Sequence, residues 1–173
     1  MTEKSMVRKE LKDLKTKANI FKDDDWETTP TILKSITSLL KDNSLIYDPF
    51  YCEGRIINSW EELGFKCINE KKDAFNREHP ENFDYLISNI PFSCKEKCVK
   101  LGLELDKPFM LLMPVAVLCS AWITKYFEKI QIAVPSRRYN FSKQGEVKKG
   151  GAWFDCCWVC YKMDLPTKIV KLE

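Results

Sequence analysis

The sequence has little of what several common active sites require. It contains one histidine, His79, in a polar segment beside a proline, so Cys–His nucleophilic catalysis has little to build on. It has no Gly-Lys-Ser/Thr segment, which excludes a phosphate-binding P-loop. The longest apolar stretch, 108–122, is interrupted by Pro114 and is shorter than the about 20 residues that a bilayer span requires. Residues 1–5 contain no apolar run that would begin a secretory signal. We therefore expect no membrane association and an intracellular protein, cytoplasmic or nuclear.

The eight cysteines do not favour a disulfide framework or a metal site. A disulfide-rich fold is typical of small secreted proteins, and this chain has no secretion signal. Cys157 and Cys160 lie in an apolar segment that is typical of a buried strand, where residues three apart point to opposite faces and cannot share a zinc ion. Cys94 and Cys98 are spaced four apart. We expect buried, reduced thiols and no metal.

Length and composition indicate one globular domain. The chain has 173 residues, of which 45% are hydrophobic and 31% charged. A domain of this size buries roughly 70% of the surface of its unfolded chain, so it needs no disulfide or metal to fold. We predict a basic, flexible N-terminal arm over residues 1–22 and a single domain over residues 23–173.

Positive charge is concentrated in two segments. The net charge of the chain is +3, and residues 1–22 alone carry +4, so the remainder carries −1. The second basic segment is a loop that contains Arg137, Arg138, Lys143, Lys148 and Lys149. Two basic patches on a near-neutral body favour contact with a polyanion such as nucleic acid. A solvated tail and a solvated loop explain the charge equally well.

Apolar periodicity predicts alternating strands and helices. The expected strands are 45–47, 65–68, 83–87, 108–114, 130–134 and 152–161, and the expected helices are 30–40, 56–63, 95–105 and 118–127. Thr29 is placed to cap the first helix, and Gly64 to end the second. This alternation is typical of an α/β domain with a mostly parallel sheet and helices on both faces. Because only the basic loop joins the last two strands, we expect them to form an antiparallel hairpin at one edge.

Two strand ends carry unusual sequences. Ligands of open α/β sheets bind beyond the carboxyl ends of the strands. The first strand ends at Asp48, followed by Pro-Phe-Tyr-Cys-Glu and Gly54, where a turn can bring a polar ligand close to backbone amides. The third strand runs into Asn89-Ile-Pro-Phe92, where an amide, a carbonyl and an aromatic ring can form a niche for a flat group. An ordinary Asp-Pro turn and an ordinary Asn-x-Pro turn are the competing interpretations.

Taken together, these segments resemble a family. Residues 48–54 (Asp-Pro-Phe-x-Cys-x-Gly) resemble the cofactor motif of S-adenosylmethionine-dependent amino methyltransferases, and residues 83–92 resemble their catalytic strand and Asn-Pro-Pro-Tyr/Phe motif. Residues 25–30 (Asp-Trp-x-Thr-x-Pro) resemble the opening segment of phage and viral adenine methyltransferases of this type. Residues 73–75 are similar to the Asp-Phe-Phe that follows their second strand, and residues 134–161 to their final hairpin. The resemblance extends over nearly the whole body and implies a Rossmann-like class I methyltransferase fold.

The resemblance also implies roles for individual residues. Catalysis would fall to Asn89, Ile90, Pro91 and Phe92, with the Asn89 amide and the Ile90 carbonyl accepting the two N–H bonds of an adenine amine and Phe92 stacking on the base. The cofactor, S-adenosylmethionine, would contact Trp26, Thr28, Asp48, Phe50, Gly54, Glu70, Asp73 and Phe75. In this arrangement Asp48 lies near the methionine ammonium, Glu70 near the ribose and Asp73 near the adenine amine. The basic loop would hold the nucleic acid, DNA in preference to RNA, while the target base is flipped out.

The chain departs from the family pattern at several positions. Ile90 stands where the first proline of the catalytic motif is expected, and Glu53 stands where the cofactor turn has another glycine. The length leaves no room for a separate target-recognition domain, so sequence selectivity must come from the loops, come from a protein partner, or not exist. Two alternatives remain open at this point. One is an inactive, methyltransferase-like subunit that acts as a scaffold, and the other is methyl transfer to a different planar amine, of cytosine or of a glutamine side chain.

Overall fold

The computed structural model describes residues 27–143, 146–147 and 154–173. The predicted arm over residues 1–22, Trp26, Lys148 and Lys149 lie outside the described residues. Within the described ranges, no helix combines the length and hydrophobicity that crossing a membrane requires.

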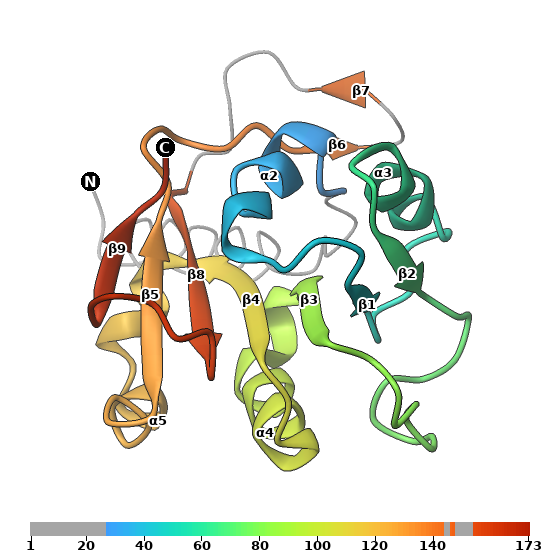
Figure 1. Cartoon of the computed structure of the whole chain (residues 1–173). Helices are drawn as coiled ribbons and strands as arrows, with labels where there is room; N and C mark the ends of the chain where they lie inside the picture. The colour runs from blue at the N-terminus through green and yellow to red at the C-terminus, as the bar shows by residue number, and fades with distance from the viewer. Residues whose placement is uncertain (1–26, 144–145, 148–153) are drawn as a thin grey trace, which may run out of the picture.

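The centre of the structure is a seven-stranded sheet in the order β2-β1-β3-β4-β8-β5-β9 (Figure 1). Strand β8 is antiparallel to both of its neighbours, and the other strands run parallel to one another. The strands are β1 (Leu45–Tyr47), β2 (Lys66–Ile68), β3 (Tyr85–Asn89), β4 (Phe109–Pro114), β5 (Ile130–Val134), β8 (Cys156–Tyr161) and β9 (Ile169–Lys171). A separate two-stranded ribbon, β6 (Ser142–Lys143) with β7 (Glu146–Val147), stands above the sheet in Figure 1.

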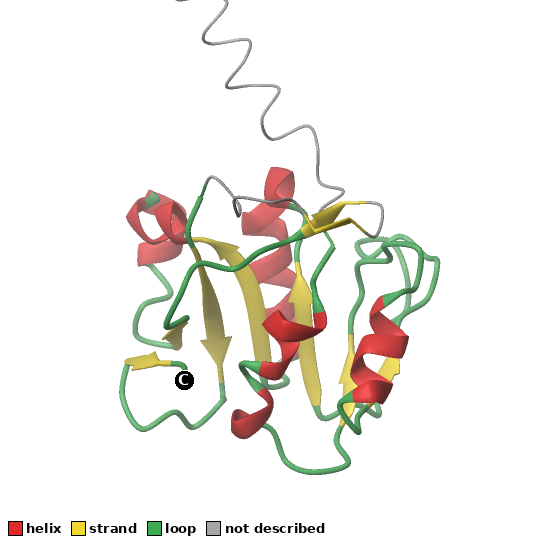
Figure 2. Cartoon of the chain, turned by 90° about the horizontal axis from the view of Figure 1, so that it is seen from above, coloured by secondary structure: helices red, strands yellow, loops and turns green. Residues whose placement is uncertain are grey.

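Helices cover both faces of this sheet. In Figure 2, α4 and α5 lie on one side of the strands and α2 on the other, where it packs against α3. The α-helices are α2 (Pro30–Lys34), α3 (Ile56–Glu62), α4 (Lys95–Leu105) and α5 (Ala121–Thr124). The 3₁₀ turns are η1 (Thr37–Leu39), η2 (Phe92–Cys94) and η3 (Val115–Cys119).

The predicted fold class is confirmed. The sheet is mostly parallel, helices cover both faces, and β5 and β8 form the expected antiparallel hairpin. The detail at the edge differs from the prediction, because β8 is inserted between β4 and β5 and the additional strand β9 forms the edge. The sequence pattern missed β9 because only three residues pair there, and Ile169 remains 66% exposed.

Two predicted helices are shorter than expected. The first ends at Lys34, where the Ser35 hydroxyl donates to the carbonyl of Ile32 (2.7 Å) and the chain continues as η1. Serine hydroxyls compete in this way with the backbone bonds of a helix. Thr29 occupies the N-cap position, but its hydroxyl donates to the carbonyl of Asn140 (3.3 Å) instead of capping the helix. The expected helix over 118–127 is divided between η3 and α5 by the extended backbone of Ser120.

The core lies along the central strands. All six residues of β4 are buried, as are five of the six in β8, because helices cover one face and the segments around α2 cover the other. The eight cysteines are free thiols, and those of β8 are fully enclosed in this core. Burial raises the pKa of the Cys157 thiol to about 12. That thiol is therefore protonated and unreactive at neutral pH. The expectation of buried thiols holds for the three cysteines of β8 and for Cys98, whereas Cys52 and Cys119 are exposed.

Candidate functional site

A cavity of about 410 Å³ lies at the carboxyl ends of β1 and β3. Its wall includes four residues that the sequence singled out from widely separated segments, Thr28, Asp48, Phe50 and Asn89. Arg55, at the start of α3, and Ser142, on β6, also line it. A volume of this order is within the range of small-molecule sites. The parallel sheet brings these segments together because both strands end at the same edge.

Asp48 is the most perturbed group in this wall. Its side chain is almost completely buried, with the residue 5% exposed. Oδ1 accepts a hydrogen bond from the Ser88 hydroxyl (2.7 Å) and another from the Phe50 N–H (3.0 Å). Burial raises the pKa of Asp48 to about 7, and the two hydrogen bonds only partly oppose that rise. A buried acid beside a cavity is stabilised in its charged form when a cation binds next to it.

Asn69, which the sequence did not single out, holds the turn after Asp48. Its Nδ2 donates to the carbonyl of Asp48 (2.9 Å) and to that of Phe50 (3.4 Å). Its Oδ1 is buried and has no hydrogen-bond partner among the described residues. The signal that could have identified Asn69 is a polar residue directly after a strand at the same sheet edge. Ser88 carries a similar signal, as a polar residue inside an otherwise apolar strand.

The turn between β1 and α3 adopts left-handed backbone at two consecutive residues. Glu53 has φ +52° and Gly54 φ +70°. A Cβ atom on Gly54 would lie 3.2 Å from Cε2 of Tyr51, so a side chain there meets both strain and a close neighbour. Glu53 takes a conformation that glycine adopts without strain, and Arg55 forms ion pairs with both Glu53 and Glu27. These ion pairs support the turn in the absence of a second glycine.

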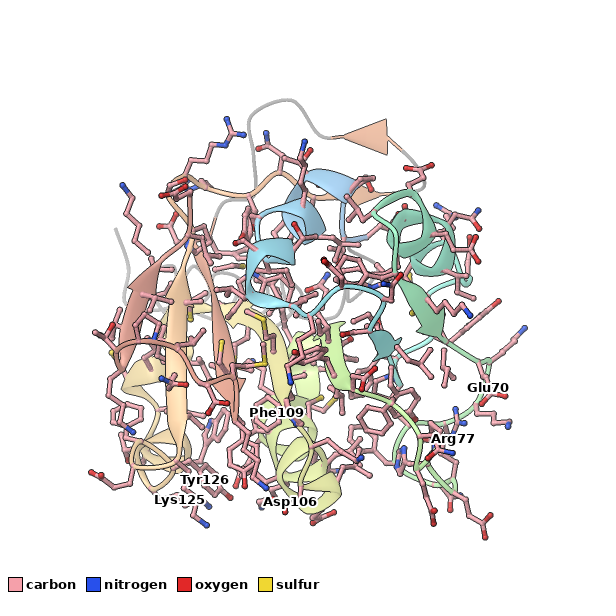
Figure 3. The ribbon with its side chains drawn as sticks, viewed as in Figure 1. Glu70, Arg77, Asp106, Phe109, Lys125 and Tyr126 are labelled. Carbon is pink, nitrogen blue, oxygen red and sulfur yellow. The ribbon has the colours of Figure 1, made fainter. Side chains whose placement is uncertain are left out.

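The loop after β2 places its predicted residues at different distances from the cavity. Glu70 forms ion pairs with Arg77 and Lys72, which lower the pKa of its carboxyl, and it does not line the cavity. In Figure 3 the Glu70 and Arg77 side chains lie at the right-hand edge of the molecule, below β2 and α3. Asp73 also lies outside the cavity wall, where its Oδ1 accepts from the Phe75 N–H (2.8 Å). Phe75 is adjacent to the cavity, because its ring centre is 5.7 Å from that of Phe50.

The predicted catalytic segment is divided between the cavity and the core. Asn89, the last residue of β3, lines the cavity. Ile90 is 2% exposed, and Pro91 is the N-cap residue that precedes η2. Phe92 is 7% exposed, and its ring packs edge-on against Phe154 with 5.4 Å between centres. In this conformation the faces of Phe92 are in the core, so stacking on a base would require the side chain to turn outward.

Residues 27–31, before and at the start of α2, line the cavity. Glu27 and Ser142 form an isolated antiparallel bridge, with N···O distances of 2.9 and 3.2 Å. This bridge joins the segment before α2 to strand β6 and places Thr28 in the cavity wall. It links residues 115 positions apart, which sequence periodicity does not reveal.

The predicted nucleic-acid residues have different surroundings. Arg138 makes a two-pronged contact with Asp155, Nε to Oδ1 at 2.7 Å and Nη2 to Oδ2 at 3.1 Å. Arg137 lines a second hollow of about 710 Å³, together with Lys34 and Arg138. Lys143 belongs to β6, beside the cavity residue Ser142.

No protein-family model matches the chain, and no curated protein matches it either. Among solved structures, the fold is similar to the crystal structure of a candidate class I S-adenosylmethionine-dependent methyltransferase from Listeria monocytogenes, with 14% sequence identity and a TM-score of 0.48. The match covers 82% of this chain and 61% of that one, so the chain spans less than two thirds of that protein's length. A likeness of this extent identifies neither a reaction nor a substrate, and function is therefore inferred from the residues of the site.

Proposed function

We propose that the protein transfers a methyl group from S-adenosylmethionine to the exocyclic amine of adenine in nucleic acid, DNA in preference to RNA. The observation that carries the proposal is the cavity that joins Asp48, at the end of β1, to Asn89, at the end of β3. The motif resemblance assigns Asp48 to the cofactor and Asn89 to the target amine. Methyl transfer requires both residues to line the same cavity.

The side chains that line the cavity have the chemistry that S-adenosylmethionine requires of its site. A buried carboxyl with a pKa of about 7 is a suitable partner for an ammonium group, because the cation removes the cost of charging the acid. Thr28 and Phe50 add a hydroxyl and an aromatic face to the wall, and Phe75 extends the aromatic surface beyond Phe50. When bound, S-adenosylmethionine supplies an electrophilic methyl group on a sulfonium. Glu70 belongs to the proposal only if its ion pairs with Arg77 and Lys72 rearrange.

The chain's own contribution to the reaction is orientation. The adenine amine is a weak nucleophile because its lone pair is delocalised into the ring. The Asn89 amide oxygen and the Ile90 carbonyl accept its two N–H bonds, which directs the lone pair toward the methyl donor. Groups arranged in this way favour the transition state without a strong base. The arrangement is consistent with a cavity whose described lining contains no histidine.

The first experiment measures cofactor binding and transfer separately. Isothermal titration with S-adenosylmethionine should give binding by the wild-type chain, and Asp48→Ala should weaken it. Asn89→Ala should abolish methyl transfer to adenine-containing DNA while leaving cofactor affinity within about twofold, since a carbonyl acceptor acts on the amine and not on the cofactor. Transfer at an undiminished rate by Asn89→Ala would overturn the site assignment. Parallel assays with RNA, cytosine-only DNA and protein decide the substrate class.

Two observations favour the second candidate, an inactive scaffold. The ring that should stack on the base, Phe92, is packed against Phe154, and Ile90 replaces a rigid proline beside it. A chain that binds nucleic acid but shows neither cofactor binding nor transfer, with or without a protein partner, would support this candidate over the enzyme.

A further inference from the structure

The second hollow is a groove between α2 and the segment that follows β5. Its volume is about 710 Å³, and residues 135–140 form one wall. Ile32, Tyr139 and Leu172 line it and are buried, whereas the residues at its rim are polar or charged and exposed. An apolar floor with a polar, open rim allows an extended ligand to lie along the surface with its charged groups at the edges.

Two cations at this rim, Lys34 and Arg137, are exposed to solvent. Lys34, at the end of α2, and Arg137 form no ion pair with the residues that the structure describes. Arg138, the next residue, is held by Asp155 through two hydrogen bonds. Glu173 is the acid that lines the same groove. Two exposed cations on facing walls, with no ion pair in the described part of the chain, are suited to the phosphates of a polyanion.

The groove adjoins the cavity that contains Asp48 and Asn89. Thr29 and Thr31 line both, so the first residues of α2 form a narrow ridge between them. A polymer in the groove therefore has a short route across this ridge into the cavity. The two walls are also fixed relative to each other, because the Tyr139 hydroxyl bonds Ser35 Oγ (2.6 Å) on the α2 side and accepts from Trp158 Nε1 (3.1 Å) in the core.

We propose that this groove binds the phosphodiester backbone of the target nucleic acid, with Lys34 and Arg137 contacting phosphates and one base crossing the α2 ridge toward Asn89. Arg138 is a positioning residue, which acts through Asp155 to hold the wall that carries Arg137. The last part of the proposal, the path of the base, rests on the proposed function. Backbone binding in the groove does not.

The test is fluorescence anisotropy with a labelled, adenine-containing oligodeoxynucleotide, single-stranded and as a duplex, over a range of salt concentrations. Lys34→Ala and Arg137→Ala should each weaken binding by about tenfold near 50 mM salt and reduce the slope of log K against log salt by about 0.7–0.9, as expected for one lost phosphate contact. Lys97→Ala is the matched control, because Lys97 is an exposed lysine on α4, on the other face of the sheet.

Three results would refute nucleic-acid binding in the groove. The first is a wild-type protein that binds neither oligonucleotide. The second is Lys34→Ala and Arg137→Ala variants that bind as tightly as the wild type. The third is a Lys97→Ala variant that loses as much oligonucleotide affinity as they do. Calorimetry with S-adenosylmethionine on the same variants separates the two proposals. If the variants bind the oligonucleotide more weakly but keep their cofactor affinity, the groove is supported. If the variants bind the oligonucleotide more weakly and the protein binds no cofactor at all, the groove is still supported, but the proposed methyltransferase activity is refuted. Normal methyl transfer with unchanged oligonucleotide affinity in both variants leaves the enzyme standing and refutes the groove.

Discussion

The buried carboxyl of Asp48 makes the stability of this protein depend on pH in an unusual direction. Most acids in folded proteins have lowered pKa values and stabilise the fold as pH rises. Asp48 has its pKa raised from 3.8 to about 7 by burial. Between these two values the folded state holds a proton on Asp48 that the unfolded state has released. The contribution of this group to stability is therefore fully present below about pH 4 and is lost as pH rises through about 7.

The size of the effect follows from the shift. About three pKa units at 1.36 kcal/mol each correspond to a loss of about 4 kcal/mol between pH 4 and pH 7. Asp48→Asn removes the titrating proton but keeps an oxygen that can accept from Ser88 and from the Phe50 N–H. The free energy of unfolding of this variant, minus that of the wild type, should increase by about 4 kcal/mol as pH rises from 4 to 7 and be constant above about pH 8.

Urea unfolding of both proteins at half-unit steps of pH measures this difference, and the comparison removes the titration of all other groups. Ser88→Ala is the companion variant: it deletes a hydrogen bond that favours the charged carboxyl, so the pH-dependent interval should extend to higher pH. If the stability difference between Asp48→Asn and the wild type were independent of pH, the carboxyl would not be titrating as its burial requires. A ligand that places a cation beside Asp48 should flatten the wild-type profile, since it stabilises the charged form.

Two further predictions concern the core. Tyr139→Phe leaves the buried indole N–H of Trp158 without its acceptor, so the free energy of unfolding should fall by about 1–3 kcal/mol in thermal denaturation, and Ser35→Ala should cost less; an unchanged melting temperature of Tyr139→Phe would contradict this. Gly102→Ala places a Cβ atom 2.8 Å from Cδ1 of the buried Phe109 ring. The free energy of unfolding should fall, because overpacking costs about 1–3 kcal/mol and the better helix propensity of alanine returns only about 1 kcal/mol. Phe109→Leu in the same chain should recover part of that loss.

Much of the secondary structure could be predicted from local pattern. The strands β1, β2, β4 and β5 lie where apolar runs of β-prone residues indicate them, and α4 occupies the predicted range. Gly64 follows α3 with φ +86°, as its expected role as a helix terminator requires. The failures are also local in origin. The Ser35 hydroxyl ends α2 early by bonding the backbone, and β9 is too short and exposed to have a recognisable period.

The site was only partly predictable. Asp48 and Asn89 could be identified because parallel strands place their carboxyl ends at one edge, which is a rule of topology. Asn69 and Ser88 were missed, because their importance lies in hydrogen bonds to Asp48 and its turn from 21 and 40 positions away. Glu70 and Phe92 do not lie where their predicted roles require. Glu70 is held by an ion pair with Arg77, and the Phe92 ring packs against Phe154. Only the packed structure shows these contacts.

The sequence by itself determined the alternation of most strands and helices, the sheet edge at which two polar segments meet, and the residue types that reach that edge. These features follow from periodicity and from the geometry of parallel strands, which are local or general. Only the tertiary structure decided which of those side chains share one cavity, that burial raises the pKa of Asp48 to about 7, that Phe92 is buried, and that Arg138 is held by Asp155. Solvation and charge pairing are set by neighbours distant in sequence, so no local pattern contains them.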